Sequence, residues 1–166
     1  MKTKLTLLLF FFCSSIFSDI TSSSIDGDWE GWNGENIIEL YDGSIWEQLE
    51  YHYSYSYSYS PEVKILNKNG NYSMLVDGED EWVDVIKLDW IKVTETRIDG
   101  DWEGWNGENI IKLYDGSIWE QLEYHYNYSY SYSPEVKIYL DYSHPKYKFY
   151  KMKVGDDKPV GVMKLK

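Results

Sequence analysis

Residues 40–65 read LYDGSIWEQLEYHYSYSYSYSPEVKI, and residues 113–138 repeat this stretch with one substitution, Asn127 in place of Ser54. Within it, tyrosine alternates with histidine or serine over residues 51–60. Successive side chains of a β-strand point to opposite faces, so a strand places these tyrosines on one face, whereas a helix scatters them around its circumference. The stretch therefore predicts β-structure.

Tight turns separate the expected strands. Asp42-Gly43 predicts a hairpin with a two-residue type I′ turn, in which both central residues need a positive φ. Asn69-Gly70 and Asp77-Gly78 mark two further turns. No segment shows the 3.6-residue apolar repeat of an amphipathic helix. Five or six short strands per unit predict an all-β protein of small antiparallel barrels, SH3-like or OB-like.

The stretch at residues 45–59 is too long for one flat strand. At roughly 3.3 Å per residue it would extend about 50 Å, which is wider than a domain of about 70 residues. We expect it to bend at a bulge near Tyr51 and His52, or to cross from one sheet to another.

The chain contains one unit twice. Residues 25–65 recur at residues 98–138, an offset of 98 − 25 = 73, and the second difference between them is Lys112 in place of Glu39. Each unit of about 65 to 70 residues is near the lower size at which a domain folds alone. Two tandem domains are the simplest arrangement, and a single intertwined fold is the alternative. The expected division is a signal peptide at 1–18, a linker at 19–24, a first β-domain at 25–88, a linker at 89–97 and a second β-domain at 98–166.

The first 18 residues are typical of a secretory signal peptide. Lys2 and Lys4 precede an apolar run at residues 5–12, and small residues follow. That run is too short to span a bilayer, so we expect no transmembrane segment in the mature chain. Cys13 follows two phenylalanines where lipoprotein processing needs small residues, so we expect no lipid anchor there. The protein is predicted to be secreted or periplasmic.

The chain is acidic and rich in aromatic residues. Its 166 residues include 28 Asp and Glu against 16 Lys and Arg, a net charge of −12, and 18% are aromatic. Nucleic-acid binding depends largely on Lys and Arg, so the charge argues against a nucleic-acid partner. The aromatic content excludes a disordered acidic tail. One cysteine leaves neither an intramolecular disulfide nor a thiolate metal cluster.

The residues from Leu40 to Gln48, followed by the alternating tyrosines and by Pro61-Glu62-Val63-x-Ile65, resemble a family of small exported bacterial β-domains. The commoner form of the motif is Leu-x-Asn-Gly-x-x-Trp-x-Gln before the tyrosine strand. Here Asp42 replaces the usual Asn and Ser44 the usual Gln. The resemblance covers both units. The family has no assigned activity, so the resemblance implies a fold and carries over no catalytic residue.

The alternating tyrosines are the main candidate binding surface. An exposed stripe of phenols would suit sugar rings or a partner protein. The alternative is that the rings are buried, because units with few Leu, Ile or Val need aromatic area in their cores. We expect burial for most of the stripe, with the serine face toward solvent. The candidate binding residues are Tyr53, Tyr55, Tyr57, Tyr126, Tyr128 and Tyr130.

The acidic opening of each unit is a candidate calcium loop, because Ca²⁺ prefers oxygen ligands in a glycine-containing loop. The calcium-loop template requires Glu at its twelfth position, where this chain has Ile37. We therefore favour a solvated acidic turn, and we expect no cofactor. The candidate ligands are Asp26, Asp28, Glu30, Asp99, Asp101 and Glu103.

Catalytic signals are weak. His52 and His125 are candidate general bases, and each is expected to face solvent on the serine side of the stripe; the third histidine, His144, lies in a loop without a counterpart in the first unit. The carboxylate pair of a glycosidase could come from Glu47, Glu50, Asp28 and Glu30, but acidic pairs are abundant here by composition alone. The sequence contains no nucleophile elbow, HExxH-type pair or phosphate loop. We therefore expect no enzyme, and a hydrolase is the least favoured hypothesis.

These observations predict an exported, non-enzymatic tandem binding module for a cell-surface glycan or an envelope protein. Two near-identical sites on a short linker would gain avidity through effective concentration. The alternative is a structural component of the cell envelope that self-associates through its tyrosine-rich strands.

Overall fold

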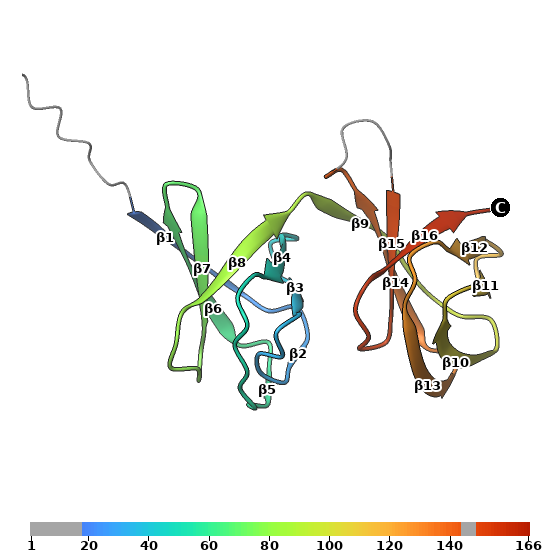
Figure 1. Ribbon diagram of the computed structural model, residues 1–166, viewed down its shortest axis with the longest axis horizontal. Helices are drawn as coiled ribbons and strands as arrows, with labels where there is room; N and C mark the ends of the chain where they lie inside the picture. The colour runs from blue at the N-terminus through green and yellow to red at the C-terminus, as the bar shows by residue number, and fades with distance from the viewer. Residues whose placement is uncertain (1–17, 144–148) are drawn as a thin grey trace, which may run out of the picture.

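The computed structural model describes residues 18–143 and 149–166, and all regular elements in these ranges are β-strands (Figure 1). The expected signal peptide, apart from Ser18, lies outside the described residues, as does Cys13. The first unit contains β1 (Ser18–Ser24), β2 (Asp28–Trp29), β3 (Ile37–Glu39), β4 (Ile45–Gln48), β5 (Ser58–Tyr59), β6 (Glu62–Lys68), β7 (Asn71–Val76) and β8 (Val83–Leu88). The second contains β9 (Trp90–Arg97), β10 (Asp101–Asn106), β11 (Ile110–Lys112), β12 (Ile118–Gln121), β13 (Tyr126–Tyr132), β14 (Glu135–Asp141), β15 (Phe149–Val154) and β16 (Val160–Lys164).

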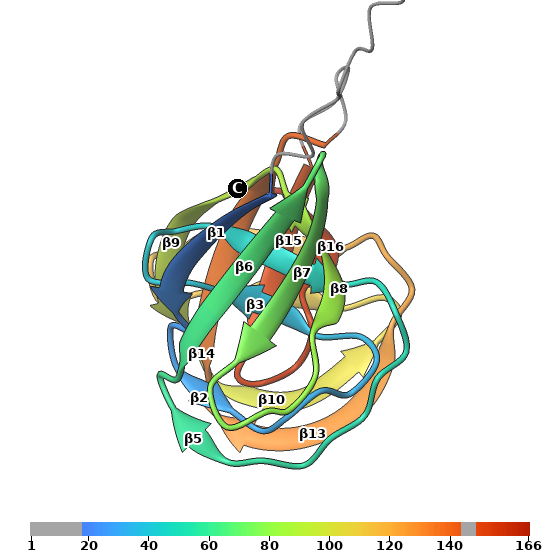
Figure 2. The same cartoon turned by 90° about the vertical axis from the view of Figure 1, so that its left-hand side faces the viewer.

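Each unit has one six-stranded sheet and one two-stranded sheet. The large sheets have the orders β1-β6-β7-β8-β4-β3 and β11-β12-β16-β15-β14-β9, and the small sheets pair β2 with β5 and β10 with β13. Neighbouring strands are antiparallel, and the large sheet of the first unit curls around its core (Figure 2). The all-β prediction and the two small antiparallel barrels are confirmed. The two units lie side by side along the longest axis (Figure 1).

The segments expected to be linkers are edge strands. β1 pairs with β6, and β9 pairs with β14 at the same place in the second unit. An edge strand leaves much of its surface in solvent, so its composition can be polar, and Ser-rich β1 resembles a linker in sequence. Only Asp89 separates β8 from β9.

The Asp42-Gly43 hairpin is present with a different turn. Gly43 has a φ of 79° and is the only residue of the turn with a positive φ. The Gly43 amide donates to the Leu40 carbonyl at 2.8 Å, which makes a three-residue loop that ends in a left-handed glycine. The Asp42 carboxylate accepts a hydrogen bond from the Ser44 amide at 2.9 Å, which stabilises this three-residue loop. The type I′ geometry occurs instead at Asn69-Gly70, where φ is 55° and 89°.

The long stretch at residues 45–59 crosses from one sheet to the other, as one of the two alternatives predicted. β4 ends at Gln48 in the large sheet, and β5 pairs with β2 in the small sheet. The buried Gln48 side chain holds the corner, since its amide donates to the carbonyls of Glu50 at 2.9 Å and His52 at 3.0 Å. Gln121 makes the equivalent bonds in the second unit.

Tryptophans and aliphatic residues fill the two cores. Trp29 and Trp32 pack edge to face with ring centroids 5.0 Å apart, and Trp102 and Trp105 repeat this pair at 5.1 Å. Trp46, after the hairpin turn, is also buried in the core. The rest of each core comes from Ile, Val, Leu and Met of the large sheet.

Candidate functional site

The alternating tyrosines lie on the surface in both units. All ten tyrosines at alternate positions from 51 to 59 and from 124 to 132 are exposed, by between 64% at Tyr130 and 85% at Tyr51 and Tyr55. The expectation that most of them are buried is therefore wrong. The tryptophans and the aliphatic residues already close each core, so the phenol rings are not needed there. All six candidate binding residues belong to this exposed surface, which we call the tyrosine stripe of each unit.

The opposite face of the same segment points toward the protein and not to solvent. The Ser54 hydroxyl accepts a hydrogen bond from the Trp32 amide at 3.0 Å, and the Ser58 hydroxyl is buried. Gly31 allows this close approach, because a Cβ there would overlap the backbone carbonyl of Ser54. Small serine side chains thus face inward while the large phenols face outward.

Two phenols are anchored by carboxylates at the start of the unit. The Tyr57 hydroxyl donates to Asp28 at 3.2 Å, and the Tyr130 hydroxyl donates to Asp101 at 3.1 Å. In both cases the pKa of the phenol is raised, mainly by the hydrogen bond to the aspartate and secondly by the negative charge of that aspartate. The first strand of each small sheet thereby orients one ring of the stripe.

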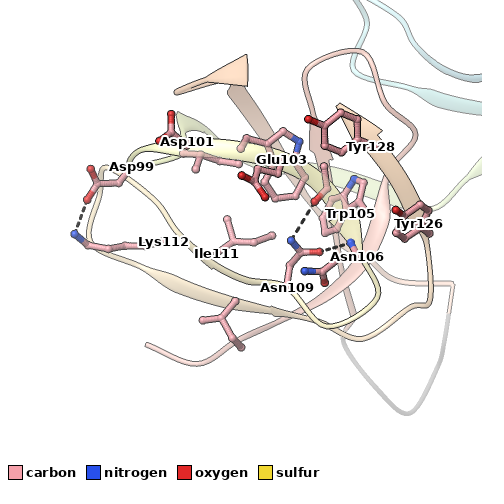
Figure 3. Close-up of a pocket in the computed structure, with 14 residues that line it drawn as sticks. Asp99, Asp101, Glu103, Trp105, Asn106, Asn109, Ile111, Lys112, Tyr126 and Tyr128 are labelled. Atoms are coloured by element: carbon pink, nitrogen blue, oxygen red, sulfur yellow. Dashed lines mark hydrogen bonds and ion pairs between the residues drawn. The ribbon is translucent and has the colours of Figure 1, made fainter. Parts of the chain in front are cut away.

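The stripe of the second unit borders a cavity of about 520 Å³ (Figure 3). Tyr126 and Tyr128 form one side, and Asp99 and Lys112 lie at the other end. Its other lining groups include acidic, amide and indole side chains: Asp101, Glu103, Asn106, Asn109, Trp102 and Trp105. The Asn109 side chain fixes this wall, as it accepts from the Asn106 amide at 2.7 Å and donates to the Gly104 carbonyl at 3.1 Å.

The equivalent residues of the first unit line a cavity of about 430 Å³, which the second unit partly covers. Lys137, Lys153 and residues 156–159 of the second unit form part of its wall. The two cavities therefore have the same inner wall, and only the first also has wall residues from the other unit.

Glu39 is the centre of the contact between the units. Its carboxylate lies 2.9 Å from the Lys92 ammonium and 3.3 Å from the Lys137 ammonium, and it accepts a hydrogen bond from the Tyr139 hydroxyl at 3.1 Å. Burial acts to raise the pKa of this carboxyl, but the Lys92 hydrogen bond and the two lysine charges hold it below its usual 4.5. Burial and the Glu39 charge raise the pKa of the Tyr139 phenol. Within the second unit, Trp90 of β9 stacks at a tilt on Tyr139 of β14 with ring centroids 6.0 Å apart.

The candidate metal ligands have other partners. Asp26 lies 3.7 Å from the Lys92 ammonium, Asp99 is paired with Lys112, and Asp28 and Asp101 accept the tyrosine hydrogen bonds. Glu30 and Glu103 line the two cavities. Across residues 18–143 and 149–166, no group of three or more His, Cys, Asp or Glu side chains is placed to hold a metal ion.

The candidate general bases are half-buried and do not face solvent. His52 Nδ1 lies 3.6 Å from the Glu81 carboxylate, and His125 Nε2 lies 3.3 Å from the Asp157 carboxylate. Asn127 also donates to Asp157 at 2.9 Å, which gives a structural reason for this difference between the repeats. The partners Glu81 and Asp157 lie in the divergent ends of the units, so the repeat pattern did not reveal them. His144 lies outside the described residues.

Comparison with known proteins adds no relative: no protein-family model, curated protein or solved structure matches the chain. In the part of the chain that the structure describes, no helix is long and apolar enough to cross a membrane. The arguments below therefore rest on the geometry of the stripes and cavities.

Proposed function

We propose that the protein is an exported, non-enzymatic binding module that recognises a cell-surface glycan through its tyrosine stripes. The observation that carries the proposal is the exposure of all ten stripe tyrosines, by 64% or more, with the same spacing in both units. Large exposed aromatic patches on a soluble protein mark interaction sites more often than they serve the fold.

The chemistry of the stripe and its cavity suits a sugar chain. Phenol rings stack on the apolar CH faces of sugars, and their hydroxyls hydrogen-bond at the ring edge. Within the described residues, Tyr57 and Tyr130 are the stripe tyrosines whose hydroxyls donate to a protein group. The adjoining cavity of about 520 Å³ is within the usual size range of ligand sites, and its amide and carboxylate groups can bond sugar hydroxyls.

An envelope protein is the other partner class, and self-association is the alternative role. An uncharged, β-prone and exposed alternation of tyrosine and serine favours self-association, because such segments pair readily with one another. Sedimentation of the wild-type protein distinguishes this role, since a mass that is independent of concentration contradicts it.

A glycan array, followed by calorimetric titration of the best ligand, tests the proposal. Tyr126→Ala combined with Tyr128→Ala removes the two rings that border the open cavity, and we expect at least a tenfold loss of affinity. Tyr114→Ala is the matched control, because Tyr114 is also exposed but lies in the turn between β11 and β12. Absence of binding to every glycan, or equal affinity of the two variants, contradicts the proposal.

A further inference from the structure

The two units present the same concave face in two different states. We define the concave face as residues 25–39 with Tyr53 and Tyr55 in the first unit, and as the equivalent residues 98–112 with Tyr126 and Tyr128 in the second. Within these sets only one residue differs, Glu39 against Lys112. Yet the second unit forms part of the wall of the first concave face, whereas the cavity at the second concave face is lined by residues of its own unit alone.

The second unit contacts acidic side chains of the first concave face through Lys92, Lys137, Tyr139 and Lys158, which we call its basic face. The cavity wall that the second unit contributes there also includes Lys153, Asp156 and Asp157. Three residues of the basic face meet at the Glu39 carboxylate, and Lys92 also reaches Asp26 at 3.7 Å. At the margin, Lys158 lies 3.3 Å from Glu35. Every one of these acidic partners except Glu39 has an identical counterpart on the second concave face.

Lys112 changes this pattern on the second concave face. Its ammonium pairs with Asp99, the counterpart of Asp26. Lys112 therefore already pairs with the Asp99 carboxylate, which a lysine from another copy of the chain would otherwise approach. A basic face placed here would also meet the positive charge of Lys112 where the first unit offers the Glu39 carboxylate, and like charges repel.

We propose that this single position selects the docking partner: Glu39 directs the first concave face onto the basic face of its own chain, and Lys112 excludes a second copy from the other concave face. Repeats with identical faces risk head-to-tail association, which is open-ended because the contact is heterologous. The charge reversal removes that risk and leaves the second concave face free for an external ligand. This inference concerns only the contact between units and stands without the proposed glycan binding.

The basic face is on the same chain as the first concave face, and this connection determines the expected association state of each variant. Only Asp89 separates β8 from β9, so the first unit competes for the basic face at an effective concentration on the order of millimolar. Lys112→Glu alone therefore leaves the protein monomeric, because its basic face stays occupied. Glu39→Lys alone releases the basic face, but no copy offers a matching concave face.

The double variant Glu39→Lys with Lys112→Glu exchanges the two roles while leaving net charge and composition unchanged. Its first concave face no longer fits, and its second now carries the acidic set that Glu39, Asp26 and Glu35 form in the wild type. That face can then accept the released basic face of another copy. We expect head-to-tail association in the double variant and in none of the other three proteins.

Sedimentation velocity from 5 to about 500 µM, with small-angle scattering at the lowest concentration, tests the inference. Wild type and Lys112→Glu should be compact monomers, Glu39→Lys a monomer with a larger radius of gyration, and the double variant should grow in mass beyond a dimer. Far-ultraviolet circular dichroism checks that all four proteins are folded. A double variant that stays a compact monomer, or a wild type that associates through this face, overturns the inference.

Discussion

The contact at Glu39 yields a quantitative prediction for Glu39→Ala. The carboxylate side chain is 10% exposed, while Lys92 and Lys137 are 33% and 29% exposed and can regain water when it is removed. Each such partly exposed pair contributes about 0.5 kcal/mol. The larger effect comes from Tyr139, which is 3% exposed and loses its hydrogen-bond acceptor, at a cost of about 1–3 kcal/mol. We therefore expect Glu39→Ala to lower the free energy of unfolding by about 2–4 kcal/mol.

Urea denaturation followed by tryptophan fluorescence measures this loss. Lys112→Ala is the matched control, because it removes a 61% exposed lysine at the same position of the other unit, and we expect a change within about 0.5 kcal/mol. Tyr139→Phe combined with Glu39→Ala should cost less than the two single changes together, since no hydroxyl is then left unpaired. Equal effects of Glu39→Ala and Lys112→Ala, or strict additivity with Tyr139→Phe, refute the reasoning.

Three further predictions concern pH, a glycine and the stripe. The folded-state pKa of Glu39 is below its usual 4.5, so its contribution to stability is fully present above pH 4.5 and is lost as the pH falls through the folded-state pKa. The loss in free energy of unfolding caused by Glu39→Ala should therefore shrink between pH 6 and pH 3, as parallel urea titrations can measure. Gly104→Ala should lower the free energy of unfolding by at least about 2 kcal/mol, because Gly104 has a φ of 93° and a Cβ there would overlap the backbone of β13. Gly116→Ala, at a φ of 82° with open space around it, should lower it by about 1 kcal/mol. Equal losses in melting experiments contradict this prediction. Tyr55→Ser should change stability by less than about 0.5 kcal/mol, while Met152→Ala in the core should cost about 2–5 kcal/mol by the same assay.

The fold could be predicted from the repeat because its signals are local. Alternation of side chains, Asp-Gly and Asn-Gly turns and the length of residues 45–59 depend on neighbouring residues and on distance along the chain. These signals correctly predicted the β-strands, the hairpins and a crossing between sheets. The details that depend on φ values and on edge pairing, such as the turn at Gly43 and the strand β1, were not predicted.

The orientation of the tyrosine stripe illustrates why local patterns are insufficient for the site. Alternation predicts that all the rings share one face but not which face is inside. The decision depends on whether other residues fill the core, and Trp32 with its neighbours does so. The same limit applies to His125, whose partner Asp157 is 32 residues away in a part of the unit without a matching repeat.

The two positions that differ between the repeats carry information that only their contacts explain. The Asn127 amide donates to Asp157, whereas the Ser54 hydroxyl accepts from the Trp32 amide. Glu39 meets lysines of the other unit, whereas Lys112 pairs with Asp99 of its own unit. In sequence, both are isolated substitutions within 41 otherwise identical residues, since 65 − 25 + 1 = 41.

The sequence by itself determined that the protein is an all-β tandem repeat with alternating tyrosines, because strand periodicity and turn chemistry act over a few residues. Only the tertiary structure decided that the tyrosines are exposed and that the second unit partly covers the first concave face but not the second. Burial and charge pairing depend on which distant residues compete for the same space. Two nearly identical units therefore differ through their surroundings: Glu39 lies against the basic face of its neighbour, and Lys112 lies beside an open cavity.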